Sequence, residues 1–254
     1  MGRQWRFYIE FVSLVSILLC TPGLNAQKMP NAQDLLNRLD KNMVAENRIT
    51  VSTMIIHGRR GGRSIQAKSW TEGSDKAYTE YLAPAREKGT KMLKVGDQLW
   101  TYSPSTDRII QIAGHMLRQS VMGSDLSYED MMEDQTLSDM YTPEIVGSDT
   151  VGGRNCWVLK LTAKKEGVAY PSRKIWLDKE RDLPLRETRY ASSGKLLKET
   201  RIQEVFKVEG RWYPKRMTFK DMLSSGKGTE FIVDSIEFDA KIPDYIFTKA
   251  VLRR

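Results

Sequence analysis

The sequence predicts a mainly β fold, a single antiparallel meander of roughly ten to twelve strands with helices near its start, middle and end. Beyond residue 47, apolar residues recur with a period of two over most of the chain, which is typical of strands. Turn sequences such as VGDQ, SSGK and VEGR separate these runs. The runs follow one another at the spacing of hairpins and not of strand–helix–strand crossovers, so we expect an antiparallel sheet.

Residues 1–26 have the pattern of a cleaved signal peptide. Arg3 and Arg6 precede an apolar run over residues 11–19, and Ala26 follows as a candidate cleavage position. The run falls short of the ~18 residues that a membrane span needs. We therefore expect an exported protein whose residues 27–254 form one domain.

Cysteine usage favours a fold that is held together by its packed core. Cys20 lies in the predicted signal peptide, and the residues before it lack the small side chain of a lipidation site. Cleavage leaves Cys156 alone, and a single cysteine cannot form an internal disulfide. A mature chain of about 230 residues is long enough to bury a stabilising core.

The formal net charge of +8 favours partners with anionic surfaces. Arg3, Arg6 and Glu10 contribute +1 of this charge, so the mature part carries +7. Acidic and basic residues alternate along the predicted strands, as in KIWLDKERDLPLRETRY, which is typical of a solvated face and not of a polynucleotide groove. We expect transient contact with a membrane surface and no nucleic-acid partner.

A helix is expected over residues 31–47, with Asn31 as its N-cap. Its apolar stripe consists of Leu35, Leu36, Leu39 and Met43. The candidate strands cover residues 48–57, 63–71, 76–82, 90–95, 98–103, 108–112, 144–151, 155–163, 173–178, 185–191, 196–208, 211–222 and 228–240. A last short helix is expected to be capped by Asp244 and to present Ile246 and Phe247.

The segment between residues 113 and 132 interrupts the strand pattern. It is apolar and rich in methionine, and it runs into the sequence GSDLSYED. Ser127 is placed to cap a short helix, and Asp130, three residues later, completes a capping box. In the strand before this segment, Trp100 and Tyr102 lie two residues apart and share one face. We expect the short helix to lie across an aromatic sheet face, so that the sheet and the helix together form a container.

The candidate site is an apolar groove between that sheet face and its helical cover. Aromatic side chains would form a fixed wall, and methionine side chains would adapt to variable ligands. A closed hydrophobic core is the alternative that the same residues allow. The candidate acyl-chain-binding residues are Trp70, Tyr78, Trp100, Tyr102, Met116, Leu117, Met122, Leu126, Tyr128 and Met131.

The sequence lacks the residue patterns of the common catalytic sites. It contains two histidines, and it has no HExxH, CxxC, GxSxG or phosphate-binding P-loop motif. Cys156 precedes Trp157 in a predicted strand, where an inert thiol is the expected state. The glycines of GRRGGR, residues 58–63, suit a hairpin tip, although backbone N–H groups there can also hold an anion. We expect no enzyme activity, no metal and no cofactor.

The run KMLKVGDQLWTYSPSTDRIIQIAGHMLRQSVMGSDLSYEDM resembles the outer-membrane lipoprotein-sorting protein family, the relatives of the periplasmic lipoprotein carrier LolA. PAREKGTKML and IPDYIFTKAVL also resemble that family, so the likeness covers nearly the whole mature chain. The resemblance implies an unclosed half β-barrel whose concave face is covered by short helices. It also implies acyl-chain binding in that cavity and a location in the periplasm. The carrier LolA closes its lid with an arginine, and no residue of this sequence is assigned that role.

The resulting hypothesis is a monomeric periplasmic carrier that binds the acyl chains of a lipoprotein or lipid in a hydrophobic groove and hands them toward the outer membrane. Its cover has to move, because burying an acyl CH₂ is worth ~0.8 kcal/mol and two fully buried chains would not be released. Residues 119–125 are the candidate hinge. The alternative is a non-enzymatic accessory subunit of an inner-membrane exporter of the resistance-nodulation-division type, which carries no lipid.

Overall fold

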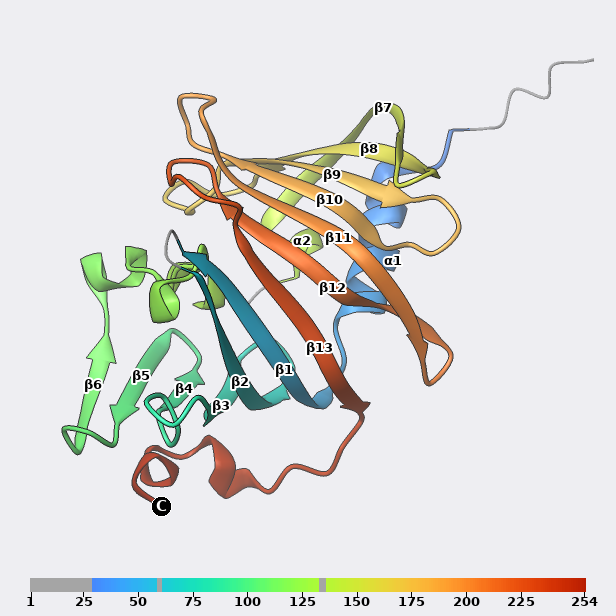
Figure 1. Ribbon diagram of the computed structural model, residues 1–254. Coiled ribbons are helices and arrows are strands. Elements are labelled where there is room, and N and C mark those ends of the chain that lie inside the picture. Colours follow the sequence, from blue (N-terminus) through green and yellow to red (C-terminus); the bar gives the residue numbers. More distant parts are fainter. Residues whose placement is uncertain (1–28, 59–60, 133–135) are drawn as a thin grey trace, which may run out of the picture.

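The computed structural model describes residues 29–58, 61–132 and 136–254 (Figure 1). In this part of the chain, thirteen strands form one antiparallel sheet that does not close into a barrel. The predicted class, mainly β with an unclosed sheet, is confirmed. All thirteen candidate strands join the sheet, although only ten to twelve were expected to do so. The predicted signal peptide, residues 1–26, lies outside the described residues.

The bounds of the strands match the predicted runs to within a few residues. The strands are β1 (Asn47–Gly58), β2 (Gly61–Glu72), β3 (Lys76–Ala83), β4 (Lys91–Val95), β5 (Gln98–Ser103), β6 (Arg108–Ile112), β7 (Tyr141–Val151), β8 (Arg154–Ala163), β9 (Ser172–Asp178), β10 (Pro184–Tyr190), β11 (Leu196–Val208), β12 (Arg211–Asp221) and β13 (Thr229–Phe238). Gly58 pairs with Gly61 across β1 and β2, so the predicted hairpin at GRRGGR is present.

The sheet consists of two meanders, the first from β1 to β6 and the second from β7 to β13, which are joined at their inner strands. Its strand order is β6-β5-β4-β3-β2-β1-β13-β12-β11-β10-β9-β8-β7. The central β1 and β13 strands, the first and last of the chain, pair with each other. The two free edges are therefore β6 and β7, which are consecutive in the sequence. The segment between them has to pass from one edge of the open sheet to the other.

The helical segments are short, and most of them are 3₁₀ turns. They are α1 (Ala32–Met43), η1 (Gly114–Arg118), η2 (Val121–Gly123), η3 (Glu129–Met132), α2 (Leu137–Met140), η4 (Asp244–Phe247) and η5 (Lys249–Arg253). Three of the 3₁₀ turns, η1 to η3, lie in the segment after β6. We call residues 113–132 the insert.

Helix α1 begins where the sequence predicts and ends earlier. The Asn31 side chain accepts hydrogen bonds from the N–H groups of Gln33 and Asp34, at 2.8 and 3.2 Å, and so caps the helix. The expected end at residue 47 is wrong, because Val44 already has an extended backbone with φ −96° and ψ 131°. Asn47 begins β1 and pairs with Glu72 of β2, so its backbone belongs to the sheet.

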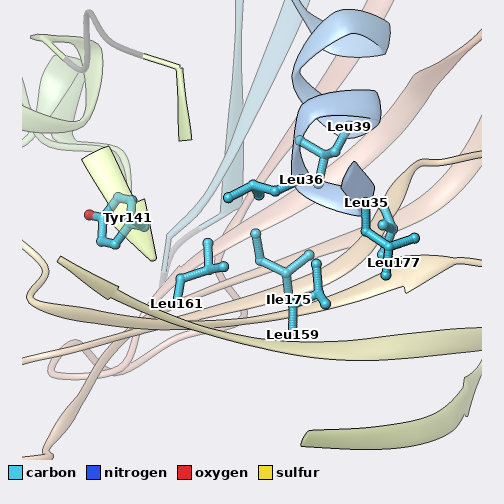
Figure 2. Close-up of a cluster of buried hydrophobic side chains, with 8 residues drawn as sticks. All are labelled: Leu35, Leu36, Leu39, Tyr141, Leu159, Leu161, Ile175 and Leu177. Atoms are coloured by element: carbon cyan, nitrogen blue, oxygen red, sulfur yellow. The ribbon is translucent and has the colours of Figure 1, made fainter. Parts of the chain in front are cut away.

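The leucines of α1 form a buried cluster with strands β7 to β9 (Figure 2). The buried members of this cluster are Leu35, Leu36, Leu39, Tyr141, Leu159, Leu161, Ile175 and Leu177. The buried Asp40 at the same helix accepts hydrogen bonds from the backbone N–H groups of Leu137 and Ser138 and so holds the start of α2. The helical face that the sequence predicts to be apolar is the face that packs.

Helix α1 and the insert lie on one face of the sheet, which we call the inner face. Each residue of a register pair points to the same side as its partner. Leu159 pairs with Ile175, Ile175 with Glu187, Glu187 with Thr200, and Thr200 with Phe219. These side chains therefore all lie on the same face. Two residues further along β13, Phe231 pairs with Met54, which packs beneath the insert. Figure 1 shows both segments inside the curl of the sheet.

The C-terminal turns η4 and η5 cover the opposite, outer face. Phe247, Val251 and Leu252 pack there against Tyr78 and Trp100. The expectation that the short helices all cover the concave face is therefore wrong for this end of the chain. The expected cap is also wrong, because Asp244 is the first residue of η4 and Pro243 occupies the cap position without a side-chain hydrogen bond.

Replacing Leu36 by alanine tests the packing of α1. The side chain is completely buried, so we expect Leu36→Ala to lower the free energy of unfolding by about 2–5 kcal/mol through the cavity that it leaves. Urea denaturation followed by circular dichroism measures this. The exposed Lys41→Ala on the same helix is the control and should change the value by less than about 0.5 kcal/mol. Equal effects would mean that α1 is not packed as described.

Candidate functional site

The insert packs against the first meander through apolar side chains. Its residues Met116, Leu117, Met122 and Tyr128 are partly buried against the sheet. The buried side chains that they meet, together with Val121 of the insert, form what we call the inner cluster. Its members are Met54, Ile65, Ala67, Tyr81, Met92, Leu99, Ile112 and Val121. Four of the predicted acyl-chain-binding residues thus lie together on the inner face.

The four predicted aromatic residues form a separate group on the outer face. Trp70, Tyr78, Trp100 and Tyr102 pack with the C-terminal turns and not with the insert. Trp70 and Tyr78 are register partners whose ring centroids lie 5.3 Å apart. The expected container with an aromatic wall and a methionine cover is therefore wrong, because the sheet separates the two sets of side chains.

Strand alternation explains this separation. Leu99 and Trp100 are neighbours in β5, so their side chains point to opposite faces. Trp100 and Tyr102 do share a face, as the sequence predicts, but the insert covers the face of Leu99. Sequence reasoning missed Tyr81 and Met92, which lie beneath the insert and make a hydrogen bond of 3.2 Å from the Tyr81 hydroxyl to the sulfur. The same strand alternation could have identified these two residues, because they lie on the face opposite to the predicted aromatic residues.

The last two predicted residues lie at the far end of the insert. Leu126 is half-buried and lines a pocket toward the second meander. Met131 is 38% exposed and does not belong to the inner cluster. The candidate site in the structure is therefore the inner cluster with the insert residues above it.

Asp125 anchors the insert to the second meander. Its carboxylate accepts hydrogen bonds from the Thr229 hydroxyl at 2.8 Å and from the Asp221 backbone N–H at 2.9 Å. Its backbone carbonyl accepts a hydrogen bond of 2.7 Å from the ammonium group of Lys198. Lys220 lies 3.7 Å from the same carboxylate. These contacts reach β11, β12 and β13, on the other side of the curl from β6.

Asp130 is the second anchor, and it has both local and distant partners. The predicted capping box is confirmed, because Asp130 accepts from the Ser127 N–H at 2.7 Å and the Ser127 hydroxyl accepts from the Asp130 N–H at 3.2 Å. The same carboxylate accepts hydrogen bonds from Arg189 of β10 at 3.0 Å and from the Tyr170 hydroxyl at 2.7 Å. Lys198 lies 3.8 Å from it. We call Asp125 and Asp130 the carboxylate anchor.

Below the carboxylate anchor, a chain of polar side chains crosses the inner face. Arg189 donates to Glu187 at 3.1 Å, and Glu187 also accepts from Arg173 at 2.9 Å. Arg173 is almost completely buried and donates to the Tyr141 hydroxyl at 2.8 Å. The Tyr141 hydroxyl in turn donates to the backbone carbonyl of Tyr170. This network leads from Tyr141, a member of the buried cluster around α1, to Asp130 of the insert.

The network shifts the pKa values of its carboxylates. Burial alone would raise the pKa of Asp130, but the Arg189 guanidinium and the hydrogen bonds from Ser127 and Tyr170 outweigh it and lower this pKa. Burial would likewise raise the pKa of Glu187, and the positive charges of Arg189 and Arg173 lower it to about 2. Both groups are therefore ionised at neutral pH.

A small pocket lies between the carboxylate anchor and strands β10 to β12. Its cavity volume is about 10 Å³, room for about one water molecule. Its lining residues are Asp125, Leu126, Asp130, Arg189, Lys198, Glu199, Thr200, Phe219 and Lys220. Pockets that hold drug-sized ligands measure roughly 300–1,000 Å³. In this conformation the pocket is therefore too small for such a ligand.

The backbone of the insert contains three left-handed positions. Gly114, Met122 and Gly123 have φ values of 55°, 52° and 70°. Glycine adopts this conformation readily, but Met122 does so at a steric cost. Two of these residues fall in the predicted hinge, residues 119–125. A side chain at Gly123 would also meet the Arg63 guanidinium at 3.2 Å.

Cys156 and His57 lie far apart in the described part of the chain. Burial raises the pKa of the Cys156 thiol to about 11, so the group is protonated at neutral pH. His57 of β1 contacts Glu230 at 2.7 Å and lies six strands away from the β8 strand that carries Cys156. In residues 29–58, 61–132 and 136–254, no group of three or more His, Cys, Asp or Glu side chains could hold a metal ion.

None of the helices in the described part of the chain has the length and apolar character that crossing a membrane requires.

Three solved structures share this fold. A domain from Vibrio parahaemolyticus described as an outer membrane lipoprotein-sorting protein matches with a TM-score of 0.76 and 22% identity, over 88% of this chain and 98% of its own. A LolA superfamily protein from Nitrosomonas europaea matches with a TM-score of 0.73 and 22% identity, over 88% and 100%. A DUF1329 family protein from Desulfovibrio piger matches with a TM-score of 0.78 and 23% identity, over 87% of this chain and 97% of its own. The predicted resemblance is confirmed.

Among curated proteins, none matches this sequence. A DUF1329-like family model, which describes its members as uncharacterized proteins, matches residues 73–254. This match spans more than half of the sequence, and the chain therefore belongs to the DUF1329-like family, within the fold of the outer membrane lipoprotein-sorting proteins.

Proposed function

We propose that the protein is a periplasmic carrier that holds the acyl chains of a lipid or lipoprotein between the inner cluster and the insert. One observation carries the proposal: the two sides of the insert are held by different interactions. Apolar side chains hold it to the first meander, and the carboxylate anchor holds it to the second. Lifting the insert would therefore uncover an apolar surface on the first meander and break polar contacts with the second.

This asymmetry suits a cover that opens for a ligand. Acyl chains can replace the apolar contacts that Met116 and Met122 lose, at ~0.8 kcal/mol for each CH₂ that they bury. Polar contacts that break can be replaced by water, so their net loss is smaller than their strength in isolation. The left-handed positions at Met122 and Gly123 give the insert a place to bend. Capture and release then require only modest free energies.

The sequence and the fold both support a periplasmic setting. The signal-peptide pattern of residues 1–26 supports export, and the solved relatives include a lipoprotein-sorting domain. The positive charge of the chain favours brief docking on anionic membranes, where a carrier exchanges its cargo. The accessory-subunit alternative differs in one respect, because it predicts no bound lipid.

The direct test is lipid capture by the delipidated protein, with mass spectrometry of co-purified lipid as a second readout. We expect the unmodified protein to bind a fluorescent acyl lipid and Met116→Asp with Met122→Asp to lose at least about tenfold in affinity, because each charge would enter the apolar site. Met29→Asp, at a methionine that is 63% exposed, is the control and should bind normally. Absence of lipid from the unmodified protein would reject the carrier in favour of the accessory subunit.

Weakening the carboxylate anchor should speed capture. In Asp125→Asn with Asp130→Asn, the hydrogen bond from Arg189 loses its charge assistance, and the ion pairs with Lys198 and Lys220 are lost. We expect roughly tenfold faster uptake of the fluorescent lipid, since charge-assisted hydrogen bonds are the stronger ones.

The control for the anchor variant is Asp97→Asn in an exposed turn, which should leave the uptake rate unchanged. Stopped-flow fluorescence gives the rates, and circular dichroism shows whether the variants are folded. An unchanged rate in a folded anchor variant would mean that these carboxylates do not restrain the insert.

Acid should weaken the network beneath the insert. The folded-state pKa of Glu187, about 2, lies below its ordinary value of 4.5. The ionised carboxylate therefore favours the folded state above about pH 4.5, and this contribution is lost as the pH falls toward 2. We expect urea denaturation to show a decrease on the order of 3 kcal/mol across that range. Glu187→Gln should flatten the dependence, and an equally steep curve in this variant would contradict the assignment.

A further inference from the structure

Positive charge is concentrated on the strands beneath the carboxylate anchor. The cations are Arg173 of β9, Arg189 of β10, Lys198 of β11 and Lys220 of β12, and the carboxylates of these strands that contact them are Glu187 and Asp221. Glu199 also lines the pocket, but its carboxylate is paired with Arg186 and Arg201. Asp130 of the insert contacts Arg189 and Lys198, and Asp125 contacts Lys220. Lifting the insert would remove both of these carboxylates from the cations.

The same place is connected to the apolar site. Phe219 lines the pocket beside Arg189 and Lys198. Its ring lies 6.3 Å from that of Phe231, and Phe231 packs against the inner cluster. The cations thus lie at one end of a continuous apolar path. A ligand that fits both parts has an anionic group at one end and an acyl chain at the other.

We propose that Arg189 and Lys198 bind the phosphate of an anionic lipid head group in the place that Asp130 occupies in this structure. This inference rests on the proposed carrier function and names its ligand class, an acyl lipid with a negatively charged phosphate. Asp130 is then a built-in competitor for the head group. The head group releases the insert from β10 as it binds, and the acyl chains take the place of the insert on the inner cluster.

The exchange of one anion for another is chemically balanced. The Asp130 carboxylate divides its two oxygens among Arg189, Tyr170 and Ser127. A phosphate offers acceptor oxygens to a guanidinium fork and to a lysine ammonium group at the same time. Arg189 and Lys198 would therefore contact an anion before and after the exchange, which limits the cost of removing Asp130. A neutral lipid has no anionic group to put in the place of the Asp130 carboxylate.

The test compares phosphatidylglycerol with diacylglycerol that carries the same fluorescent acyl chains. We expect the unmodified protein to bind phosphatidylglycerol about tenfold more tightly, the ratio that one charge-assisted interaction supplies. Lys198→Gln and Arg189→Gln should bring the ratio close to one while diacylglycerol is still captured. Lys160→Gln, at an exposed lysine of β8, is the matched control and should keep the ratio.

Asp130→Asn separates a competitor from a simple restraint. Removal of a restraint alone would raise the affinity for both lipids equally, whereas removal of a competing anion should raise the phosphatidylglycerol affinity more. We therefore expect the ratio between the two lipids to increase at least about threefold in this variant. An unchanged ratio in a folded Asp130→Asn protein, together with an unchanged ratio in Lys198→Gln, would overturn the proposal.

The remaining outcomes distinguish the two proposals from each other. Equal capture of the two lipids by the unmodified protein would reject the head-group site and leave the carrier function intact. Capture of neither lipid would reject the carrier function itself. Inorganic phosphate should displace phosphatidylglycerol only at far higher concentrations than the lipid, because it has no acyl chain to bury. Displacement at similar concentrations would show that the site binds free phosphate, and the lipid proposal would fail.

Discussion

The structure depends on one constraint of topology: the two free edges of an open sheet follow each other in the chain. Because β6 and β7 lie at opposite ends of the strand order, the segment that joins them has to cross the opening of the curl. A cover over the inner face is therefore a consequence of the connectivity. The sequence of the insert then determines how firmly that cover is held, through apolar residues on one side and two carboxylates on the other.

Charge burial beneath the insert follows from this arrangement. Arg173 is only 1% exposed, and a buried ion pair that loses one partner is strongly destabilised. Asp130 of the insert adds a further carboxylate to the Arg173–Glu187–Arg189 chain. An inner face built only from apolar residues would bind an acyl chain, but it would have no means of holding the empty cover in one position. The buried network gives the closed form a defined geometry.

The sequence predicts the strands well because turn residues and alternating apolar residues are local signals. The same signals do not identify the face that the insert covers. Leu99 and Trp100 are adjacent and both apolar, so the sequence of β5 suits either orientation of the strand. The predicted site was placed on the face of Trp100 because that face carries the aromatic residues. The choice is made by the C-terminal turns, whose Phe247 and Val251 take the outer face more than 140 residues later in the chain. The end of α1 at Met43 was missed for a similar reason. It depends on the pairing of Asn47 with β2, which lies later in the chain.

Asp130 shows most clearly what local reasoning includes and what it leaves out. Its place three residues after Ser127 identifies a capping box, and the structure confirms that role. The partner that gives the residue its wider importance, Arg189, lies 59 positions away, and no sequence spacing indicates it. One carboxylate thus holds both the start of η3 and the contact with β10. An anion that takes Arg189 from Asp130 therefore also removes a charge partner from the helix start, so release of the insert and loosening of its last turn are expected to occur together.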